Sequence, residues 1–231
     1  MNMNPHTAIK CLALAMLFSL ALGSVTGIAE EGMTFSALQV AHERELDCRS
    51  QYLAFAARAD LEGHATAACL FSVVARAESI HAANHAAAIV GLGGTPAWQP
   101  KSFDVHGTAE NLTASILLEV AERHQVYRRF AGYAREECMY DALASINYAR
   151  GAEQTHEALF RVALGTLDRV EPPQLFASAS PIVTESPGPG DSAATFYLCT
   201  GDGSVFSSPA TGTCRICGAG AVRVLAVDCR H

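Results

Sequence analysis

Apolar and polar positions follow a helical period over most of residues 34–168. In residues 34–62 the pattern places a stripe of mostly apolar residues on one face of a helix, formed by Leu38, Ala41, Glu45, Cys48, Tyr52 and Phe55. Spacings of three and four are typical of a helix that packs along a single face. Gly63 marks a turn, and a second helical face follows over residues 65–92 until glycines and prolines end it.

The same pattern predicts two further helices. A connection of about 16 residues follows the second helix, and at ~3.3 Å per residue it can run the whole length of a bundle. The third helix begins at Thr108, which is followed by an acidic first turn, and extends to about Arg135. A weaker break near Glu137 precedes a fourth helix that runs to Leu167. The expected fold is all-α, an antiparallel four-helix bundle over residues 34–168.

Composition changes after the bundle. Residues 169–195 are rich in Pro, Ser, Ala and Gly, which predicts a flexible linker. Residues 196–231 contain Gly-rich Cys motifs between two short strand-like segments, Phe196–Leu198 and Val222–Val227. We expect a small β module at this end of the chain.

Residues 1–29 resemble a targeting segment. They combine a weakly basic start at Lys10 with an uncharged run from Cys11 to Ala29, which predicts a cleaved signal peptide or a membrane anchor. The expected location is therefore exported, periplasmic or envelope-associated. The alternative is a cytoplasmic form that starts at Met33, directly before the first helix. A net charge of -7 on 231 residues argues against a nucleic-acid partner.

Two Glu-x-x-His motifs, Glu78/His81 and Glu153/His156, each place a carboxylate and an imidazole on one helix face. Such pairs also arise by chance, so the motifs alone are weak evidence for a metal site. Their positions relative to the turns and to other glutamates favour a metal site over chance. Glu45 lies 18 residues before Gly63 and Glu78 lies 15 after it, so both reach similar heights in a helical hairpin, within about 5 Å.

The second hairpin repeats this arrangement with Glu119 and Glu153, which are 34 positions apart, compared with 33 for Glu45 and Glu78. Each hairpin offers one Glu and one Glu-x-x-His, the ligand set of two-metal sites in bundles. Burying a carboxylate without a partner costs folding free energy on the order of several kcal/mol per group. Two divalent cations bound between the carboxylates would remove that cost. Glu122, one turn after Glu119, is a seventh potential ligand. Iron or manganese suits these donors, and zinc can compete.

These residues resemble the rubrerythrin family over about residues 34–168 and into the C-terminal module. The matching motifs are Glu45 with Arg49 and Tyr52, Glu78-x-x-His81, Thr108-Ala109-Glu110-Asn111-Leu112, Glu119-x-x-Glu122 with Tyr127, and Glu153-x-x-His156-Glu157. The resemblance implies a ferritin-like bundle with a di-iron centre that reduces hydrogen peroxide to water. It also implies re-reduction by an electron donor, which we expect to be a small donor protein or reductase. The expected assembly is a homodimer.

The resemblance further assigns roles. Glu78 and Glu119 would bridge the two irons, Glu45 and either His81 or Glu122 would serve one iron, and Glu153 and His156 the other. Glu122 would act as a switching ligand as the oxidation state changes. Catalytic roles are expected for Tyr52 and Tyr127, which would hydrogen-bond within the site. Each tyrosine is equally consistent with an aromatic core residue.

The C-terminal module departs from the rubredoxin-like pattern of two Cys-x-x-Cys motifs. It has Cys214-x-x-Cys217 but Cys199-x-x-Asp202, so one sulfur ligand of an iron site is missing. Three alternatives remain open: Asp202 completes a second metal site, Cys229 takes the fourth position, or the site is empty or holds structural zinc. Cofactors are therefore two iron ions, with one further iron or zinc as a candidate.

Two cysteines within the bundle are expected to be packing residues. Cys48 and Cys69 lie on either side of the Gly63 turn at heights that differ by roughly 13 Å, too far apart for a disulfide between them.

Two other functions compete with a peroxidase. The first is a ferroxidase or iron-handling role for a ferritin-like bundle. The second is a non-catalytic metal-binding protein whose bundle holds zinc.

Overall fold

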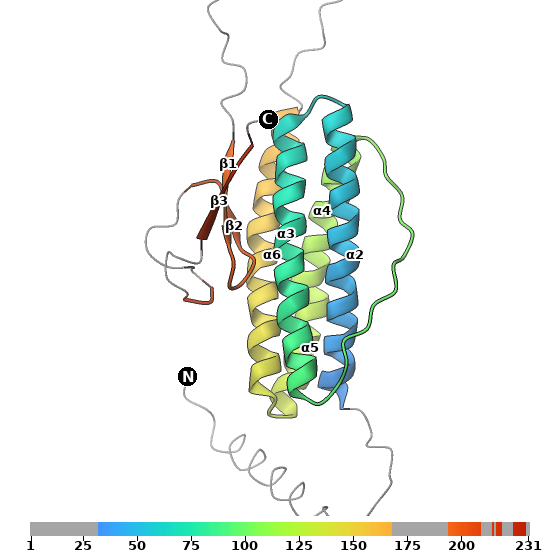
Figure 1. Ribbon diagram of the computed structural model, residues 1–231, viewed down its shortest axis with the longest axis vertical. Coiled ribbons are helices and arrows are strands. Elements are labelled where there is room, and N and C mark those ends of the chain that lie inside the picture. Colours follow the sequence, from blue (N-terminus) through green and yellow to red (C-terminus); the bar gives the residue numbers. More distant parts are fainter. Residues whose placement is uncertain (1–31, 168–193, 209–213, 215, 219–223, 230–231) are drawn as a thin grey trace, which may run out of the picture.

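The computed structural model describes residues 32–167, 194–208, 214, 216–218 and 224–229. It confirms the all-α bundle with a small β module (Figure 1). The helical elements are α2 (Met33–Leu61), α3 (Ala65–Gly91), α4 (Thr108–Ala121), the π-helix η1 (Glu122–Val126), α5 (Tyr127–Glu136) and α6 (Tyr140–Leu167).

The turns between helices lie where the sequence predicts them. Gly63 has a φ of 81° between α2 and α3, a left-handed conformation that glycine adopts without steric cost. The connection from α3 to α4 runs along the outside of the bundle (Figure 1). It ends where the carboxylate of Glu62 accepts hydrogen bonds from the backbone N–H and the hydroxyl of Thr108, at 2.8 and 2.6 Å. The end of α2 thereby caps the start of α4.

The third helix runs without a break over residues 108–136, as the sequence predicted, but its hydrogen bonding changes in the middle. Its middle turn, η1, has π-helical hydrogen bonding over Glu122–Val126 and divides the helix into α4 and α5. A π-helical turn holds one residue more than an α-helical turn, so it rotates the side chains that follow it. Such turns occur frequently at functional sites.

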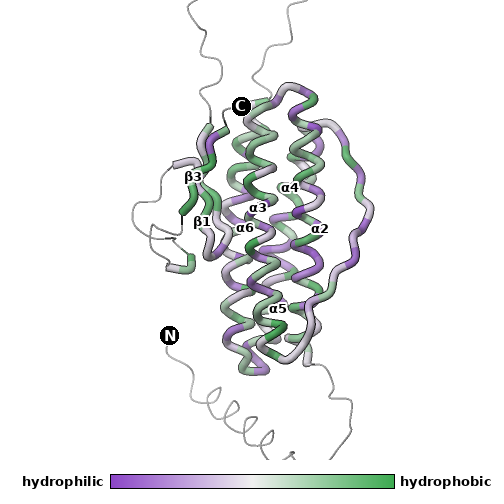
Figure 2. The backbone as a smooth tube through the Cα atoms, in the orientation of Figure 1, coloured by the Kyte–Doolittle hydropathy of each residue, from purple (hydrophilic) through white to green (hydrophobic). Residues whose placement is uncertain are grey.

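The core consists of two apolar clusters along the bundle. One contains the aromatic side chains of Tyr52, Phe55, Phe71 and Phe160. The other contains Leu38, Ile89, Tyr127, Phe130 and Ile146. Figure 2 shows the hydrophobic positions distributed along all the helices, interrupted by hydrophilic ones. Between the two clusters lies a layer of buried Glu and His side chains.

The β module is a three-stranded antiparallel sheet in the order β2-β1-β3. The strands are β1 (Thr195–Cys199), β2 (Val205–Phe206) and β3 (Val224–Asp228). Two of them overlap the predicted strands, and β2 was not predicted. Phe196, Leu198 and Val205 join the apolar cluster of the bundle, so the module packs directly on α3 and α6 (Figure 1).

A disulfide between Cys69 of α3 and Cys229 after β3 links the module covalently to the bundle. Interpreting Cys69 as a packing residue was therefore wrong, and Cys229 is not a fourth metal ligand. Heights along the bundle exclude only a disulfide with Cys48, whereas the partner of Cys69 lies 160 positions further along the chain. Cys48 keeps its thiol and is buried, as expected of a packing residue.

The expected leader at 1–29 and almost all of the expected linker at 169–195 lie outside the described residues. Among the described helices, none has a stretch apolar enough, over sufficient length, to span a bilayer.

Candidate metal centre

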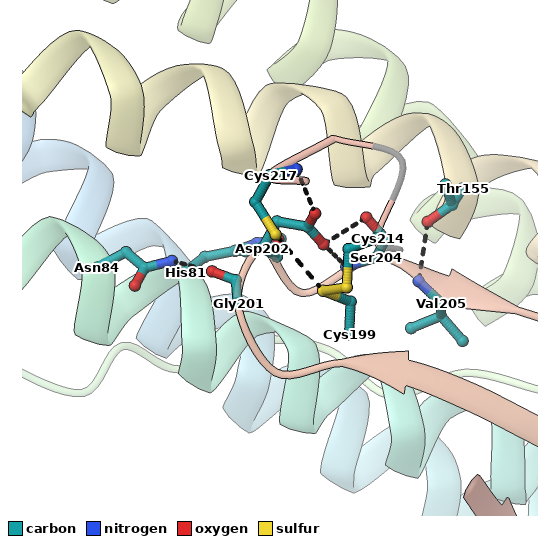
Figure 3. The surroundings of a disulfide bond; sticks show 10 residues. All are labelled: His81, Asn84, Thr155, Cys199, Gly201, Asp202, Ser204, Val205, Cys214 and Cys217. Atoms are coloured by element: carbon teal, nitrogen blue, oxygen red, sulfur yellow. Dashed lines mark hydrogen bonds between the residues drawn. A yellow bond between two sulfur atoms is a disulfide. The ribbon is translucent and has the colours of Figure 1, made fainter. Parts of the chain in front are cut away.

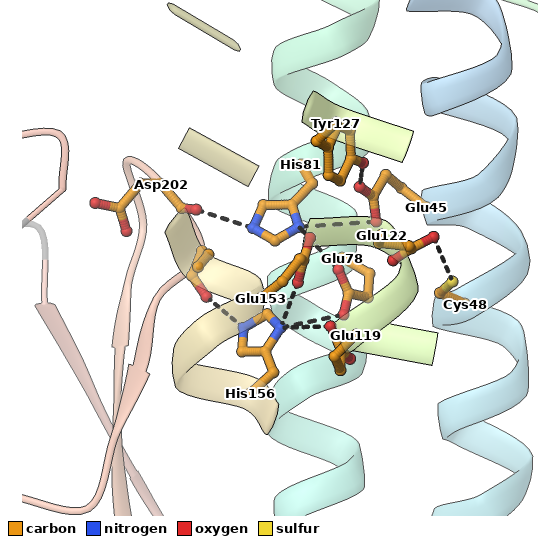
Figure 4. A network of polar contacts seen from close by, with 12 residues as sticks. Glu45, Cys48, Glu78, His81, Glu119, Glu122, Tyr127, Glu153, His156 and Asp202 are labelled. Atoms are coloured by element: carbon orange, nitrogen blue, oxygen red, sulfur yellow. Dashed lines mark hydrogen bonds and ion pairs between the residues drawn. The ribbon is translucent and has the colours of Figure 1, made fainter. Parts of the chain in front are cut away.

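All seven predicted ligands are buried in the layer between the apolar clusters, each at most 2% exposed. Glu45 comes from α2, Glu119 from α4 and Glu122 from η1, while α3 and α6 each supply a Glu-x-x-His pair. Their side chains converge on one another across the bundle (Figure 4). The hairpin geometry that the sequence suggested is confirmed.

Six of the residues form two groups whose ligand atoms lie within 4.8 Å of one another. The first group is Glu45, Glu78, His81 and Glu153, and the second is Glu78, Glu119, Glu153 and His156. Each group combines carboxylate oxygens with one imidazole nitrogen, the donor set that iron accepts in such bundles.

Glu78 and Glu153 belong to both groups. Glu78 directs one oxygen to Nδ1 of His81 at 2.8 Å and the other to Nδ1 of His156 at 3.4 Å. Glu153 does the same, at 3.3 Å from His81 and 2.9 Å from His156. Two carboxylates that each face both imidazoles are placed to bridge two metal ions.

The bridging role expected for Glu119 does not agree with this geometry. Glu119 belongs to the His156 group only, with an oxygen 3.9 Å from Nδ1 of that histidine. Glu153 on α6, which belongs to both groups, would be the second bridging carboxylate with Glu78 of α3. Sequence spacing gives the height of a ligand along the bundle but not how far its side chain reaches across it.

The outer nitrogen of each histidine is hydrogen-bonded to the β module. Nε2 of His81 lies 2.9 Å from the carbonyl oxygen of Asp202, and Nε2 of His156 lies 3.0 Å from that of Gly203. A carbonyl oxygen only accepts, so Nε2 carries the proton and donates. When a ring loses its second proton to bind metal, its lone pair is therefore on Nδ1, directed at the carboxylates.

Both predicted tyrosines lie in the site. The Tyr52 hydroxyl donates to Oε1 of Glu119 at 2.5 Å, and the Tyr127 hydroxyl donates to Oε1 of Glu45. Tyr52 is also packed against Phe71 and Phe160. The two interpretations offered by the sequence, site residue and core residue, both apply to it.

Glu122 lies at the edge of the first group, close to Glu45 and Cys48. Its Oε1 accepts hydrogen bonds from Nε and Nη2 of Arg44, at 3.0 and 2.7 Å. The Sγ of Cys48 lies 3.9 Å from the same oxygen. Burial first, and then the charge of Glu122, raise the pKa of the Cys48 thiol well above its usual value, so the thiol stays neutral.

Sequence reasoning missed several residues of the site. His85 lies one turn after His81, and its Nε2 is 3.8 Å from Oε1 of Glu45 while Ser145 holds its Nδ1 at 2.8 Å. Its i+4 spacing from His81 is a signal that could have identified it. Arg44 directly precedes Glu45 and therefore points away from that residue's helix face, so spacing gave no signal for its contact with Glu122.

The metal-free cluster holds protons. Burial, and then the neighbouring carboxylate of Glu153, raise the pKa of Glu78 to about 7. For His156 burial acts in the opposite direction and lowers the pKa. The negative charges of Glu78 and Glu153 outweigh burial and raise the pKa of His156 to about 10. Divalent cations would displace these protons when they bind.

Unsatisfied buried atoms indicate that the site fits metal. In the described part of the chain, five buried side-chain atoms of the cluster accept or donate no hydrogen bond of good geometry, although two of them face each other at 2.9 Å as an ion pair. They are Oε2 of Glu45, Oε2 of Glu119, both oxygens of Glu153 and Nδ1 of His156. Buried polar atoms without partners are costly and rare in native proteins. All five belong to the predicted ligands, and all are oxygen or imidazole donors that suit iron.

The C-terminal cysteines do not fit a tetrathiolate iron site in this form. Cys199, Asp202, Cys214 and Cys217 lie within 4.8 Å of one another, as the sequence predicted. However, Cys199 and Cys214 form a disulfide, which removes two sulfur ligands. Whether the reduced residues bind metal stays a prediction.

Comparison with known proteins identifies the family. A family model described as Rubrerythrin matches residues 36–164, more than half of the chain. The chain therefore belongs to the rubrerythrin family, whose members are oxidoreductases with a di-iron centre. A search of curated proteins finds no match.

Solved structures of nigerythrin have the same fold. Nigerythrin in the fully reduced, all-ferrous state is 23% identical, with a TM-score of 0.70 and coverage of 90% of this chain and 91% of that chain. Its mixed-valence state is 24% identical, with a TM-score of 0.69 and the same coverage. The likeness extends beyond the bundle, because it covers far more of the chain than the family model does.

Proposed function

We propose that this chain is a non-haem di-iron peroxidase that reduces hydrogen peroxide to water with electrons from an external donor. The observation that supports it best is the pair of ligand groups sharing Glu78 and Glu153, with Glu122 as an additional carboxylate beside the first group. When bound, two ferrous ions supply the two electrons that peroxide reduction needs.

The chain's own residues hold the ligands in position. The hydroxyls of Tyr52 and Tyr127 each fix one oxygen of a carboxylate, Glu119 and Glu45 respectively. The other oxygen of each carboxylate has no hydrogen-bond partner and is available to bind metal. The apolar clusters on both sides of the site exclude bulk water from it.

Glu122 and His81 offer alternative donors to the metal position beside Glu45. His81 faces that position directly, whereas Glu122 is held at its edge by Arg44. A carboxylate stabilises the more highly charged ferric ion better than an imidazole does. Exchange between these two side chains would therefore allow one position to serve both oxidation states.

Stopped-flow reoxidation tests the proposal. We expect the anaerobically reduced, iron-loaded protein to react faster with hydrogen peroxide than with oxygen. Glu122→Gln should slow the peroxide reaction, while Glu136→Gln, an exposed glutamate on α5, should leave it unchanged. Equal rates with peroxide and oxygen would contradict the peroxidase and favour iron oxidation. Retention of zinc in place of iron would favour a non-catalytic metal-binding protein.

We also infer that the protein is exported. The uncharged run after Lys10 is typical of a signal peptide, and the Cys69–Cys229 disulfide supports an oxidising compartment. Cell fractionation with N-terminal sequencing tests this. An intact Met1 in the cytoplasmic fraction would contradict it.

A further inference from the structure

Three sulfur atoms and one carboxylate meet where the β module contacts the bundle. Cys199 at the end of β1 is bonded to Cys214, and the Sγ of Cys217 lies 3.8 Å from that of Cys199. Figure 3 shows the third sulfur beside the disulfide, with His81 and Asn84 of α3 close to the same loop. A thiol at this distance needs only a small movement to reach a disulfide sulfur.

The three cysteines differ in their access to solvent. Cys199 and Cys214 are 0% and 1% exposed, whereas Cys217 is partly exposed. A reductant in solution therefore cannot reach the Cys199–Cys214 disulfide directly. It can reach the sulfur of Cys217.

Asp202 occupies the position of the missing fourth cysteine but is engaged elsewhere. Its Oδ1 accepts hydrogen bonds from the backbone N–H and hydroxyl of Ser204, at 2.9 and 2.6 Å. Its Oδ2 accepts one from the backbone N–H of Cys217 at 2.9 Å. The carboxylate thus holds the two halves of the loop together, which places Cys217 beside the disulfide.

One peptide group connects this loop to the metal centre. The carbonyl of the Asp202–Gly203 peptide accepts the hydrogen bond from His81, and its N–H donates to the carbonyl of Cys199 at 2.9 Å. The next carbonyl, of Gly203, accepts the hydrogen bond from His156. Cys199 is therefore two hydrogen bonds away from the ring of a predicted metal ligand.

We propose that the C-terminal module carries electrons as a dithiol–disulfide pair, Cys199 and Cys214, and receives them from an external dithiol through Cys217. This inference rests on the proposed peroxidase function and names the class of its electron donor. It replaces the iron of a rubredoxin-like module with sulfur chemistry, in agreement with the missing ligand and with the disulfide.

Reduction proceeds in balanced steps. The Cys217 thiolate attacks Sγ of Cys199, a Cys199–Cys217 disulfide forms, and Cys214 leaves as a thiolate that takes up a proton. A thiolate of the external dithiol then attacks the partly exposed sulfur of Cys217 and releases Cys199. The second thiol of the donor closes the donor's own disulfide and releases Cys217. The net change is two protein thiols gained and one donor disulfide formed.

Delivery to the metal centre is also balanced. Cys199 and Cys214 together give up two electrons and two protons as they re-form their disulfide. Two electrons and two protons are what the reduction of one hydrogen peroxide to two waters consumes. One dithiol thus supports one turnover.

Thiol trapping tests the reduction step without any readout of activity. The full-length protein is incubated with mixtures of reduced and oxidised dithiothreitol, alkylated at successive times until equilibrium, and mapped by mass spectrometry. We expect Cys199–Cys214 to be reduced reversibly, and Cys217→Ser to slow its reduction at least about 10-fold. An unchanged rate in Cys217→Ser, or a disulfide that resists reduction until the protein unfolds, would overturn the proposal.

A stoichiometric titration tests delivery to the metal centre. The protein is loaded with two Fe(II) per chain while its disulfides are intact, reduced, freed of reductant, and treated anaerobically with hydrogen peroxide. We expect two equivalents to be consumed rapidly, with the Cys199–Cys214 disulfide re-formed after the first, as the dithiol re-reduces the iron that the second then oxidises. The Cys199→Ser/Cys214→Ser variant should stop after one equivalent, whereas the matched Cys69→Ser/Cys229→Ser variant should consume two.

The outcomes separate this inference from the proposed function. If the first equivalent oxidises the iron but no disulfide re-forms, the peroxidase stands and the dithiol carrier fails. If peroxide does not oxidise the iron, the proposed function fails, while thiol trapping still decides whether Cys217 opens the disulfide. Two further results would overturn the dithiol carrier: thiols that oxidise equally fast without iron, and a third iron bound by the reduced cysteines.

Discussion

The carbonyl oxygen of Gly203 lies 3.0 Å from Nε2 of His156. Together with the neighbouring contact of the Asp202 carbonyl to His81, this hydrogen bond places one loop of the β module against both histidines of the metal centre. The loop determines which nitrogen of each ring carries the proton. The β module is therefore part of the metal centre's outer shell rather than a separate attachment.

Gly203→Ala tests this outer shell. A Cβ at this position would lie 2.3 Å from Nε2 of His81, and the φ of 79° disfavours any other residue. We expect the loop to be displaced from both histidines and iron affinity to fall about 10–100-fold, as with other outer-shell substitutions. Competition with a chelator measures this.

Gly218→Ala is the matched control for that experiment. Gly218 also has a positive φ, 70°, but nothing lies within 4 Å of the added carbon. It should carry the same kind of backbone strain without a clash at the histidines. Equal losses of iron affinity in the two variants would show that the contact with His81 is not the cause.

Arg44→Met tests how Glu122 is held. Glu122 is 2% exposed and Arg44 about one-third exposed, so removing the guanidinium leaves a buried carboxylate without its ion-pair partner. We expect the metal-free protein to lose about 2 kcal/mol of unfolding free energy, below the full penalty for a wholly buried pair. Denaturant unfolding measures this.

A double-mutant cycle separates that pair from general effects of losing an arginine. In the Arg44→Met/Glu122→Gln variant most of the loss should be recovered, because the unpaired charge is gone. Arg161→Met, which removes an exposed arginine paired with Glu157, should cost less than about 0.5 kcal/mol. Additive losses in the cycle would contradict the ion pair.

The contact between Glu62 and Thr108 should make stability depend on pH. Hydrogen bonds from the hydroxyl and backbone N–H of Thr108 lower the pKa of Glu62 to about 2. Because the folded pKa lies below the unfolded value of about 4.5, the stabilisation is complete above pH 4.5 and is lost as the pH falls through 2.

Glu62→Gln tests that dependence. At pH 7 we expect a loss of about 1–2 kcal/mol, the range of a helix cap and a charged hydrogen bond. The difference from the unsubstituted protein should shrink between pH 4.5 and 2. Glu136→Gln, at an exposed site on α5, should show no such convergence. A constant difference for Glu62→Gln at all pH values would contradict the lowered pKa.

Much of the bundle and its ligands followed from the sequence because both depend on local regularities. Helical periodicity and the Gly63 turn fixed the heights of Glu45 and Glu78, and burial of charge then required metal. The π-helical turn at Glu122 was missed because it changes the hydrogen bonding of one turn without changing the apolar pattern around it.

Contacts between distant segments could not be predicted in the same way. The Cys69–Cys229 disulfide and the hydrogen bond from His156 to Gly203 join the bundle to a module that follows a Pro- and Gly-rich stretch. No local periodicity specifies where such a module docks. The membership of Glu153 in both ligand groups is similar, since it depends on how side chains reach across the bundle rather than on spacing along it.

Iron content in ligand variants measures the two-metal site most directly. The full-length protein, loaded anaerobically with Fe(II) and desalted, should hold two iron ions per chain. Glu153→Gln should lose both ions, because Glu153 belongs to both ligand groups. Glu119→Gln, which alters the His156 group alone, should retain one. One iron or none in the unsubstituted protein, or two in Glu153→Gln, would contradict a di-iron centre bridged by Glu78 and Glu153.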